Sequence, residues 1–488
     1  MTRSSSLSRP ARWRIASLLV VHLLIAAHII HWRLAGTTLT SIQLSDAGRF
    51  VAEGVATAAL ILFSLLFVIT VVFGWFFCAW ACHMLALQEA CRLLLGRFKV
   101  RPKLIRSRVL ALVPLYAAFY VYLQPLVERW WLGVPSPAPT LQLTSGNLWA
   151  SLPGPMASVA GVLVGGLLMV YLLGSLSFCK YVCPYGAVFA LADNLALGRM
   201  RLIGECDGCA RCTAACTTGV RVHEEVLRSG MVTSSGCMRC FECVSACPRA
   251  VLAYRLGRPA LLAGSRVGLT RYAFSLAEEG FMLVLFTMSF VALHGLYDAV
   301  PLLVSLAASV VVAYLGALSM RLLRQPFVAV RGVTLRQAAH LSRAGGLLAC
   351  GVGLLFVLLG HSLLVQYHQW RANTALAALE FPHVRTVRAA AEREVAGAAA
   401  AHLLFCRRFG LIDTFDTNMK LAWVYRLLAQ PHLVEEHLRR AIAIDPAQPA
   451  AHFNLAKELA RQGRRAEAAQ AFDEAARLAP ALAQYARE

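Results

Sequence analysis

Two cysteine runs separated by about twenty residues constrain this chain more than any other feature. The first reads CDGCARCTAAC and begins at Cys206, and the second reads CMRCFECVSACP and ends at Pro248. Each run has the spacing C-x2-C-x2-C-x3-C, so eight thiols lie within 42 residues. This is the spacing of ligands to four-iron clusters, because three cysteines at x2 intervals on a tight loop reach three irons of one cubane.

The fourth cysteine of each run points away from its own loop and, in paired sites of this kind, binds the other cluster. The rule predicts one cluster held by Cys206, Cys209, Cys212 and Cys247, and a second held by Cys237, Cys240, Cys243 and Cys216. Small residues between the ligands, such as Gly208 and Ala246, let backbone amides approach the sulfur atoms.

Two other readings of the cysteines are less consistent with the spacing. Zinc sites also use C-x2-C pairs, but they seldom add a third cysteine at x2 and a fourth at x3. A disulfide framework conflicts with the flanking charges, which place this segment in the reducing cytosol. Thr217 stands where a proline often follows the first run, so the first run is the less typical of the two.

Long apolar blocks indicate an integral membrane protein. The 488 residues are 58% hydrophobic, with a mean hydropathy of +0.60. We predict seven membrane spans, over residues 15–30, 55–73, 109–126, 157–176, 281–296, 300–318 and 345–364. The net charge of +21 comes from basic residues between these spans, which is an orientation signal rather than a sign of nucleic-acid binding.

The positions of the basic residues predict which side each loop faces. Arginines precede the first span, seven basic residues lie between Arg92 and Arg108, and five arginines lie between Arg321 and Arg343. These loops should face the cytoplasm. We therefore expect a bacterial inner-membrane protein whose N-terminus and cysteine runs are cytoplasmic. An odd number of spans then places the C-terminal region in the periplasm.

Two further cysteine pairs follow predicted spans. Cys78 and Cys82 come directly after the second span, and Cys179 and Cys183, with Pro184 and Gly186, come after the fourth. These thiols are redox or metal candidates: they could form redox-active disulfides, bind copper(I) or contact a quinone. The alternative is that they only pack the ends of the spans.

The last 120 residues are alanine-rich, charged and helical in pattern. The segment 454–480 aligns with 420–446 at a shift of 34 residues, so that Leu455 matches Leu421 and Ala475 matches Ala441. This period is typical of tetratricopeptide repeats, although two ordinary helical hairpins would also be alanine-rich. Because two repeats are fewer than a stable stack needs, we expect residues 372–410 to supply a cap or a third hairpin.

The complete set of motifs resembles the membrane polyferredoxins of bacterial respiration. These include the ferredoxin-type quinol dehydrogenase subunit of periplasmic nitrate reductase, the nitrous oxide reductase regulator and the cytochrome oxidase accessory protein. Their first motif usually reads C-G-W-x-C-P-F-G-A-L-Q-E, which is matched here by Cys78, Trp80, Cys82, Ala86, Leu87, Gln88 and Glu89. His83 replaces the proline and Leu85 the glycine, whereas the second motif matches fully.

The resemblance implies a mainly α polytopic membrane protein with an inserted 2[4Fe-4S] ferredoxin domain. We divide the chain into a membrane domain with four spans (1–177), a ferredoxin domain (178–280), a membrane domain with three spans (281–368) and a repeat domain (369–488). Electrons would pass between a quinol or cytosolic donor and a respiratory reductase, a cytochrome or a maturation partner. Such a chain is an electron carrier or oxidoreductase subunit rather than a stand-alone enzyme.

Two other functions fit the same motifs. The chain could be a redox-sensing scaffold that recruits a protein partner through its repeats, or a copper reductase that serves metalloenzyme assembly. The partners expected in each case are membrane lipid and other proteins, with no nucleic acid.

Overall fold

The structure, a computed structural model, describes residues 8–100, 102, 104–133, 135–146, 148, 154–263, 272–298, 300–338, 340–380, 389–479 and 482. It divides the chain into two compact units. Unit 1 comprises Met1–Thr287 with Leu303–Ala349, and unit 2 comprises Met288–Leu302 with Cys350–Glu488. The predicted four-part division remains a prediction.

The chain is mainly helical, as predicted, and carries long apolar helices. Among the described residues, six helical stretches are long and apolar enough to cross a membrane: Arg9–Ala35, Leu110–Trp131, Pro155–Leu173, Leu276–Leu293, Leu302–Arg324 and Arg343–Leu379. They coincide with six of the seven predicted spans. The remaining one, residues 55–73, contains the apolar helix α3 (Ala58–Phe73), which has 16 residues and is shorter than the others.

Two of the spans are not uniform α-helices. The third consists of η1 (Leu110–Leu112), α6 (Val113–Ala118), the π-helical η2 (Phe119–Leu123) and α7 (Gln124–Leu132). The fourth consists of α8 (Pro155–Ala160), the π-helical η4 (Gly161–Leu168) and α9 (Met169–Leu173). Wider π turns are uncommon and tend to occur near functional sites.

Short strands tie two interhelical connections together at one end of unit 1. After α1 (Arg9–Ala35), β1 (Thr38–Leu39) pairs antiparallel with β4 (Thr144–Ser145). β2 (Val55–Thr57), which follows α2 (Leu44–Glu53), pairs in parallel with β3 (Thr140–Gln142). The connection after the first span and the connection after the third therefore lie on the same side.

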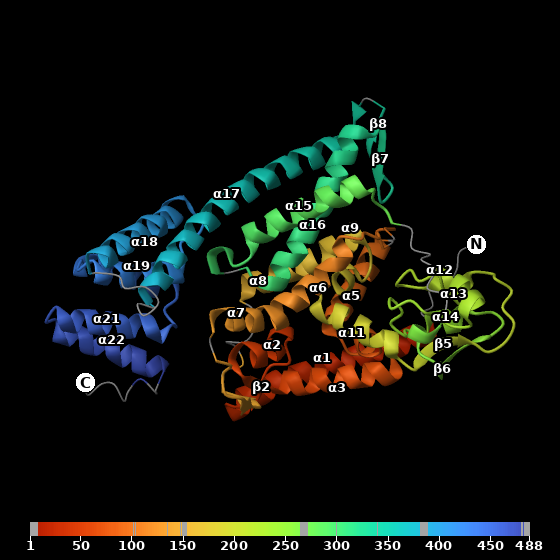
Figure 1. The fold of residues 1–488 in the computed structure, drawn as a ribbon, viewed down its shortest axis with the longest axis horizontal. Helices are drawn as coiled ribbons and strands as arrows, with labels where there is room; N and C mark the ends of the chain where they lie inside the picture. The colour runs from red at the N-terminus through yellow and green to blue at the C-terminus, as the bar shows by residue number, and fades with distance from the viewer. Residues whose placement is uncertain are drawn as a thin grey trace. The chain divides into compact units, whose positions relative to one another are not determined.

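A lobe built around a two-stranded sheet holds the two cysteine runs (Figure 1). The strands are β5 (Gly198–Leu202) and β6 (Leu252–Leu256), which pair antiparallel with Gly198 opposite Leu256. Between them lie the short helices α12 (Arg211–Ala215), α13 (Val222–Ser229) and α14 (Glu242–Ala246). The lobe core contains cysteines as well as aliphatic residues, including Met200, Cys212, Val226, Cys243 and Leu252.

The remaining elements of the membrane region follow the lobe. They are η5 (Ala260–Leu262), α15 (Leu276–Leu293), η6 (Leu296–Asp298) and α16 (Leu302–Arg324). A three-stranded antiparallel sheet comes next, formed by β7 (Phe327–Val330), β8 (Val333–Gln337) and β9 (His340–Leu341). The 38-residue helix α17 (Arg343–Glu380) begins directly after it.

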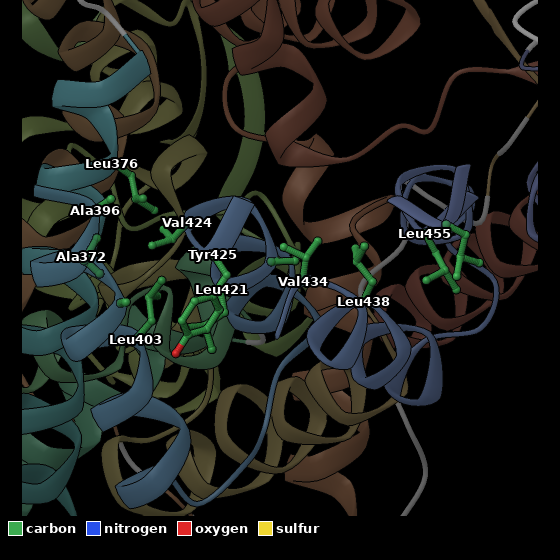
Figure 2. Packing of buried hydrophobic residues seen from close by; sticks show 14 of the residues in the cluster. Ala372, Leu376, Ala396, Leu403, Leu421, Val424, Tyr425, Val434, Leu438 and Leu455 are labelled. Atoms are coloured by element: carbon green, nitrogen blue, oxygen red, sulfur yellow. The ribbon is translucent and has the colours of Figure 1, made fainter. Parts of the chain in front are cut away.

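The C-terminal helices repeat with the predicted period. They are α18 (Ala389–Phe409), α19 (Phe415–Leu427), α20 (Pro431–Ile444), α21 (Pro449–Arg461) and α22 (Arg465–Leu478). Both ends of α19 and α20 are displaced by 34 residues from those of α21 and α22. The core between them also receives Ala372 and Leu376 from α17 and Leu403 from α18 (Figure 2). Residues 372–380 and 389–409 thus extend the stack, whereas 381–388, in the middle of the predicted cap, lie outside the described residues.

Candidate metal centre

The two cysteine runs fold as two copies of the same turn. Within each run and directly after it, the backbone takes a left-handed conformation at three equivalent positions, 31 residues apart between the runs. The pairs are Gly208 (φ 70°) with Arg239 (52°), Ala210 (56°) with Phe241 (62°), and Gly219 (69°) with Ala250 (52°). This conformation strains a residue that has a Cβ atom. Because the same strained conformation recurs in both runs, we infer that the two loops have the same function.

The structure brings Cys216 of the first run to three cysteines of the second run. Burial raises the pKa of the Cys243 thiol, and the thiols of Cys237, Cys240 and Cys216 raise it further. Burial also raises the pKa of Cys216. A hydrogen bond with the Thr218 hydroxyl partly offsets this rise, and the Cys237 thiol adds to it. This group is the predicted second ligand set.

The other group combines the start of the first run with the end of the second. Burial raises the pKa of Cys212, and the thiols of Cys206 and Cys247 contribute to the rise. Cys209 is exposed, and its amide donates to the Asp207 carboxylate over 3.2 Å. Because the four-residue ligand sets are assigned by the spacing rule, ligation itself remains a prediction.

The donor set fits iron–sulfur clusters in its chemistry. All fifteen cysteines are free thiols. Crowded buried thiols repel one another once ionised, and a cationic iron core would stabilise them as thiolates. Eight cysteines with the spacing C-x2-C-x2-C-x3-C are the donor set of two cubanes rather than of zinc sites.

A buried ion triad anchors the second run to the membrane region. The Asp193 carboxylate lies 3.2 Å from the Arg199 guanidinium and 2.7 Å from that of Arg239, and these side chains are 0%, 0% and 1% exposed. Asp193 also accepts a hydrogen bond from the Trp75 amide over 3.2 Å. Arg239 belongs to the loop Cys237–Cys240, so the triad fixes one cluster loop against the membrane helices.

Sequence reasoning missed this triad. Its members belong to α11 (Pro184–Leu195), to β5 and to a cysteine loop, and no local pattern links them. The sequence signal for the triad was Arg239, a charged residue at the position where the other run has Gly208. Both residues adopt a left-handed backbone conformation. Arg239 keeps this conformation because its guanidinium is buried between Asp193 and the Gly198 carbonyl, to which it donates over 3.1 Å.

The first C-x3-C motif lies directly beside that cluster loop. The Trp80 indole donates to the Arg239 carbonyl over 3.2 Å. A Cβ atom on Gly74 would lie 2.6 Å from the Arg239 guanidinium, so only glycine fits there. Met238, between two predicted cluster ligands, packs in the same hydrophobic cluster as Cys78.

The structure also brings together the four cysteines of the C-x3-C motifs. Cys78 and Cys179 are buried, Cys82 and Cys183 are half-buried, and all four belong to one hydrophobic cluster or pack against it. Their role as redox or metal ligands remains a prediction.

Comparison with protein families gives these motifs a common description. Residues 201–248 match a family described as a 4Fe-4S dicluster domain. Residues 55–102 and 156–202, which contain the C-x3-C motifs, both match a family described as a 4Fe-4S binding domain. Residues 449–482 match the tetratricopeptide repeat. The chain carries 4Fe-4S ferredoxin domains and a tetratricopeptide repeat. These findings support the resemblance to membrane polyferredoxins and an electron-transfer role.

Three curated proteins are similar to parts of this chain. The putative electron transport protein YccM of Escherichia coli is 26% identical over 42% of this chain and 58% of its own length. Two uncharacterized proteins of Methanocaldococcus jannaschii also match. One is 28% identical over 20% of this chain and 42% of its own length. The other is 22% identical over 44% of this chain and 88% of its own length. No solved structure matches the chain. Copper and quinone, predicted as alternatives at the C-x3-C motifs, gain no support from these comparisons.

Proposed function

We propose that this protein is a membrane electron carrier that passes electrons through two [4Fe-4S] clusters. One cluster is held by Cys206, Cys209, Cys212 and Cys247, and the other by Cys216, Cys237, Cys240 and Cys243. The observation that carries the proposal is that Cys216 lies among Cys237, Cys240 and Cys243, whereas Cys247 lies with Cys206 and Cys212. The donor is a membrane quinol or a cytosolic reductant, and the acceptor is a respiratory or maturation partner.

The anchoring of the cluster lobe supports transfer to or from the membrane region. The loop that carries Cys237 and Cys240 rests on the ends of α3 and α11 through Arg239 and Asp193. The Tyr254 hydroxyl, in β6, donates to the Phe73 carbonyl at the end of α3 over 2.9 Å. A rigid contact of this kind keeps the distance between a cluster and the next redox centre constant, which favours electron transfer over diffusion of a loose domain.

The distribution of basic loops supports a cytoplasmic lobe in a bacterial inner membrane. Arg106 donates to the Gly219 carbonyl inside the lobe, and Arg331 donates to the Tyr171 and Leu172 carbonyls over 3.0 Å, at the end of the fourth span. The two basic loops thus lie at the lobe end of unit 1, as the positive-inside rule requires of a cytoplasmic side. The connections joined by β1–β4 and β2–β3 would be periplasmic, together with the tetratricopeptide repeats.

Anaerobic purification with iron, sulfide and EPR analysis tests the proposal. Two cubanes require about eight irons and eight sulfides per chain. Reduction with dithionite should produce EPR signals of two interacting [4Fe-4S] clusters. A colourless protein, or one with fewer than about four irons per chain, would refute the two-cluster assignment.

The repeats support a second candidate, a redox-sensing scaffold that recruits a partner protein. Tetratricopeptide stacks commonly bind other proteins on their concave face. Deletion of residues 370–488 separates the two functions. An electron carrier would keep reduction of its clusters by the donor, whereas a recruiting scaffold would lose its partner in affinity capture from solubilised membranes.

A further inference from the structure

The two C-x3-C motifs belong to two copies of one structural unit. In each copy an apolar helix ends at a glycine in the left-handed region, Gly74 (φ 83°) after α3 or Gly174 (φ 105°) after α9. A short helix with the first cysteine follows, α4 (Phe77–Trp80) or α10 (Ser177–Tyr181). The second cysteine is then the N-cap of a longer helix, α5 (His83–Arg97) or α11.

The two copies pack against each other reciprocally. Helix α11 of the second copy packs on α3 of the first, and α5 of the first packs on η4 and α9 of the second. The second contact is close at a glycine, because a Cβ atom on Gly166 would lie 3.1 Å from the Leu87 side chain and 3.3 Å from the Cys91 sulfur. This exchange brings the equivalent cysteines of the two motifs, 101 residues apart in the sequence, to one place.

The four thiols form a single group. Cys78 and Cys179 belong to one buried hydrophobic cluster, and Cys82 and Cys183 pack against it. The Trp75 indole donates to the Cys78 sulfur over 2.6 Å, a hydrogen bond that favours the thiolate. The surrounding side chains are largely apolar and aromatic, and they include Phe63, Leu176, Tyr185 and Phe189.

In each copy, two backbone amides point at the second cysteine of that copy's own motif. The amides of Met84 and Leu85, in the first turn of α5, donate to the Cys82 sulfur. The amides of Tyr185 and Gly186, in the first turn of α11, donate to the Cys183 sulfur in the same way. Two helix N-termini therefore offer amide donors and positive dipole ends to sulfur ligands.

We propose that Cys78, Cys82, Cys179 and Cys183 are the four ligands of a third iron–sulfur cluster, held between the two copies. Four cysteines are the ligand set of both [2Fe-2S] and [4Fe-4S] clusters. All four thiols are free, and all four belong to one hydrophobic cluster or pack against it. They are therefore a complete four-cysteine ligand set for one cluster.

The third cluster would add a relay to the proposed electron carrier, and this relay role rests on the proposed function. Met238 and Arg239 lie between Cys237 and Cys240 of the lobe. Met238 packs in the same cluster as Cys78, and the Arg239 carbonyl accepts the Trp80 indole hydrogen bond. The loop that carries Cys237 and Cys240 therefore contacts the site of the four C-x3-C cysteines directly. Each cluster gains and loses one electron at a time, so the relay needs no proton or further reactant.

Iron content and Mössbauer spectra of the 57Fe-labelled, anaerobically purified full chain test the inference. The wild-type protein should hold about ten or twelve irons per chain, against about eight for the lobe clusters alone. The double variant Cys78→Ser/Cys179→Ser should lose about two or four irons and one spectral component while keeping the EPR signals of the lobe. Cys91→Ser, a buried cysteine beside the same helices, is the matched control and should retain all iron.

The outcomes separate this inference from the proposed function. About eight irons in the wild-type chain, with a spectrum that the double variant leaves unchanged, would overturn the third cluster and leave the carrier intact. One copper or zinc ion per chain that the double variant removes would also overturn it. A wild-type chain with fewer than about four irons would refute the carrier itself. The wild-type count decides the matter even where the double variant does not fold.

Discussion

Replacing Asp193 by asparagine should release the cluster lobe from the membrane helices. Asparagine has the same shape and can still accept the Trp75 amide hydrogen bond, so the change removes a charge without creating a cavity. It leaves the guanidinium groups of Arg199 and Arg239 buried, at 0% and 1% exposure, with no carboxylate 3.2 and 2.7 Å away to compensate them.

The expected cost is large because the triad is buried. Removing one partner of a buried ion pair costs about 3–5 kcal/mol, mostly through the uncompensated charge that remains. Since Asp193 compensates two guanidinium groups, the cost should lie toward the upper part of that range. A loss of this size raises the equilibrium constant for local opening on the order of 10²- to 10⁴-fold. An exposed ion pair would contribute less than about 1 kcal/mol.

Hydrogen exchange of the purified holoprotein in detergent measures this opening. Amides in β5, β6 and the loop 237–247 should exchange faster in Asp193→Asn, and those in α19–α22, which belong to unit 2, should be unaffected. Glu224→Gln is the matched control, because its ion pair with Arg221 is about one-third exposed at 31% and 29%. If Asp193→Asn changed the opening free energy of the lobe by no more than this control, the triad would not be the anchor.

Three further predictions concern single residues. Burial and Arg407 lower the pKa of His437 to about 4. Because this value lies below the unfolded one of about 6.5, the repeats should be fully stable above pH 6.5 and lose about 3 kcal/mol as the pH falls toward 4. Hydrogen exchange in α19 and α20 should show a smaller loss in His437→Gln. Gly186→Ala should destabilise unit 1 by about 1–3 kcal/mol in thermal unfolding, because the new Cβ atom would collide with the Cys179 carbonyl. Gly351 has open space around it, so the control Gly351→Ala should not lower the stability. Cys243→Ser should remove the EPR signal of one lobe cluster and lower the iron content by up to about four, and an unchanged iron content would exclude Cys243 as a ligand.

Much of the architecture follows from local patterns in the sequence. The spans are continuous apolar blocks, and six of them coincide with long apolar helices. The 34-residue period predicted two helical repeats, because a repeat buries the same positions in every copy, and the last four helices do recur at that displacement. The cysteine spacing predicted a dicluster domain, since ligands on one tight loop must be close in sequence. The shorter helix α3 and the π-helical turns of two spans were not predicted, because hydropathy reports composition and not helix length or winding.

Only the tertiary structure decided which distant residues meet. The chain by itself specified two C-x3-C motifs but not that their four thiols share one hydrophobic cluster, because that depends on the reciprocal packing of α5 and α11. Nor did it indicate that Arg239 is held by Asp193 and lies beside Arg199. A periodic pattern records what each residue does within its own helix or loop. An ion triad or a four-thiol group depends on how separate elements pack, and this leaves no local signature in the sequence.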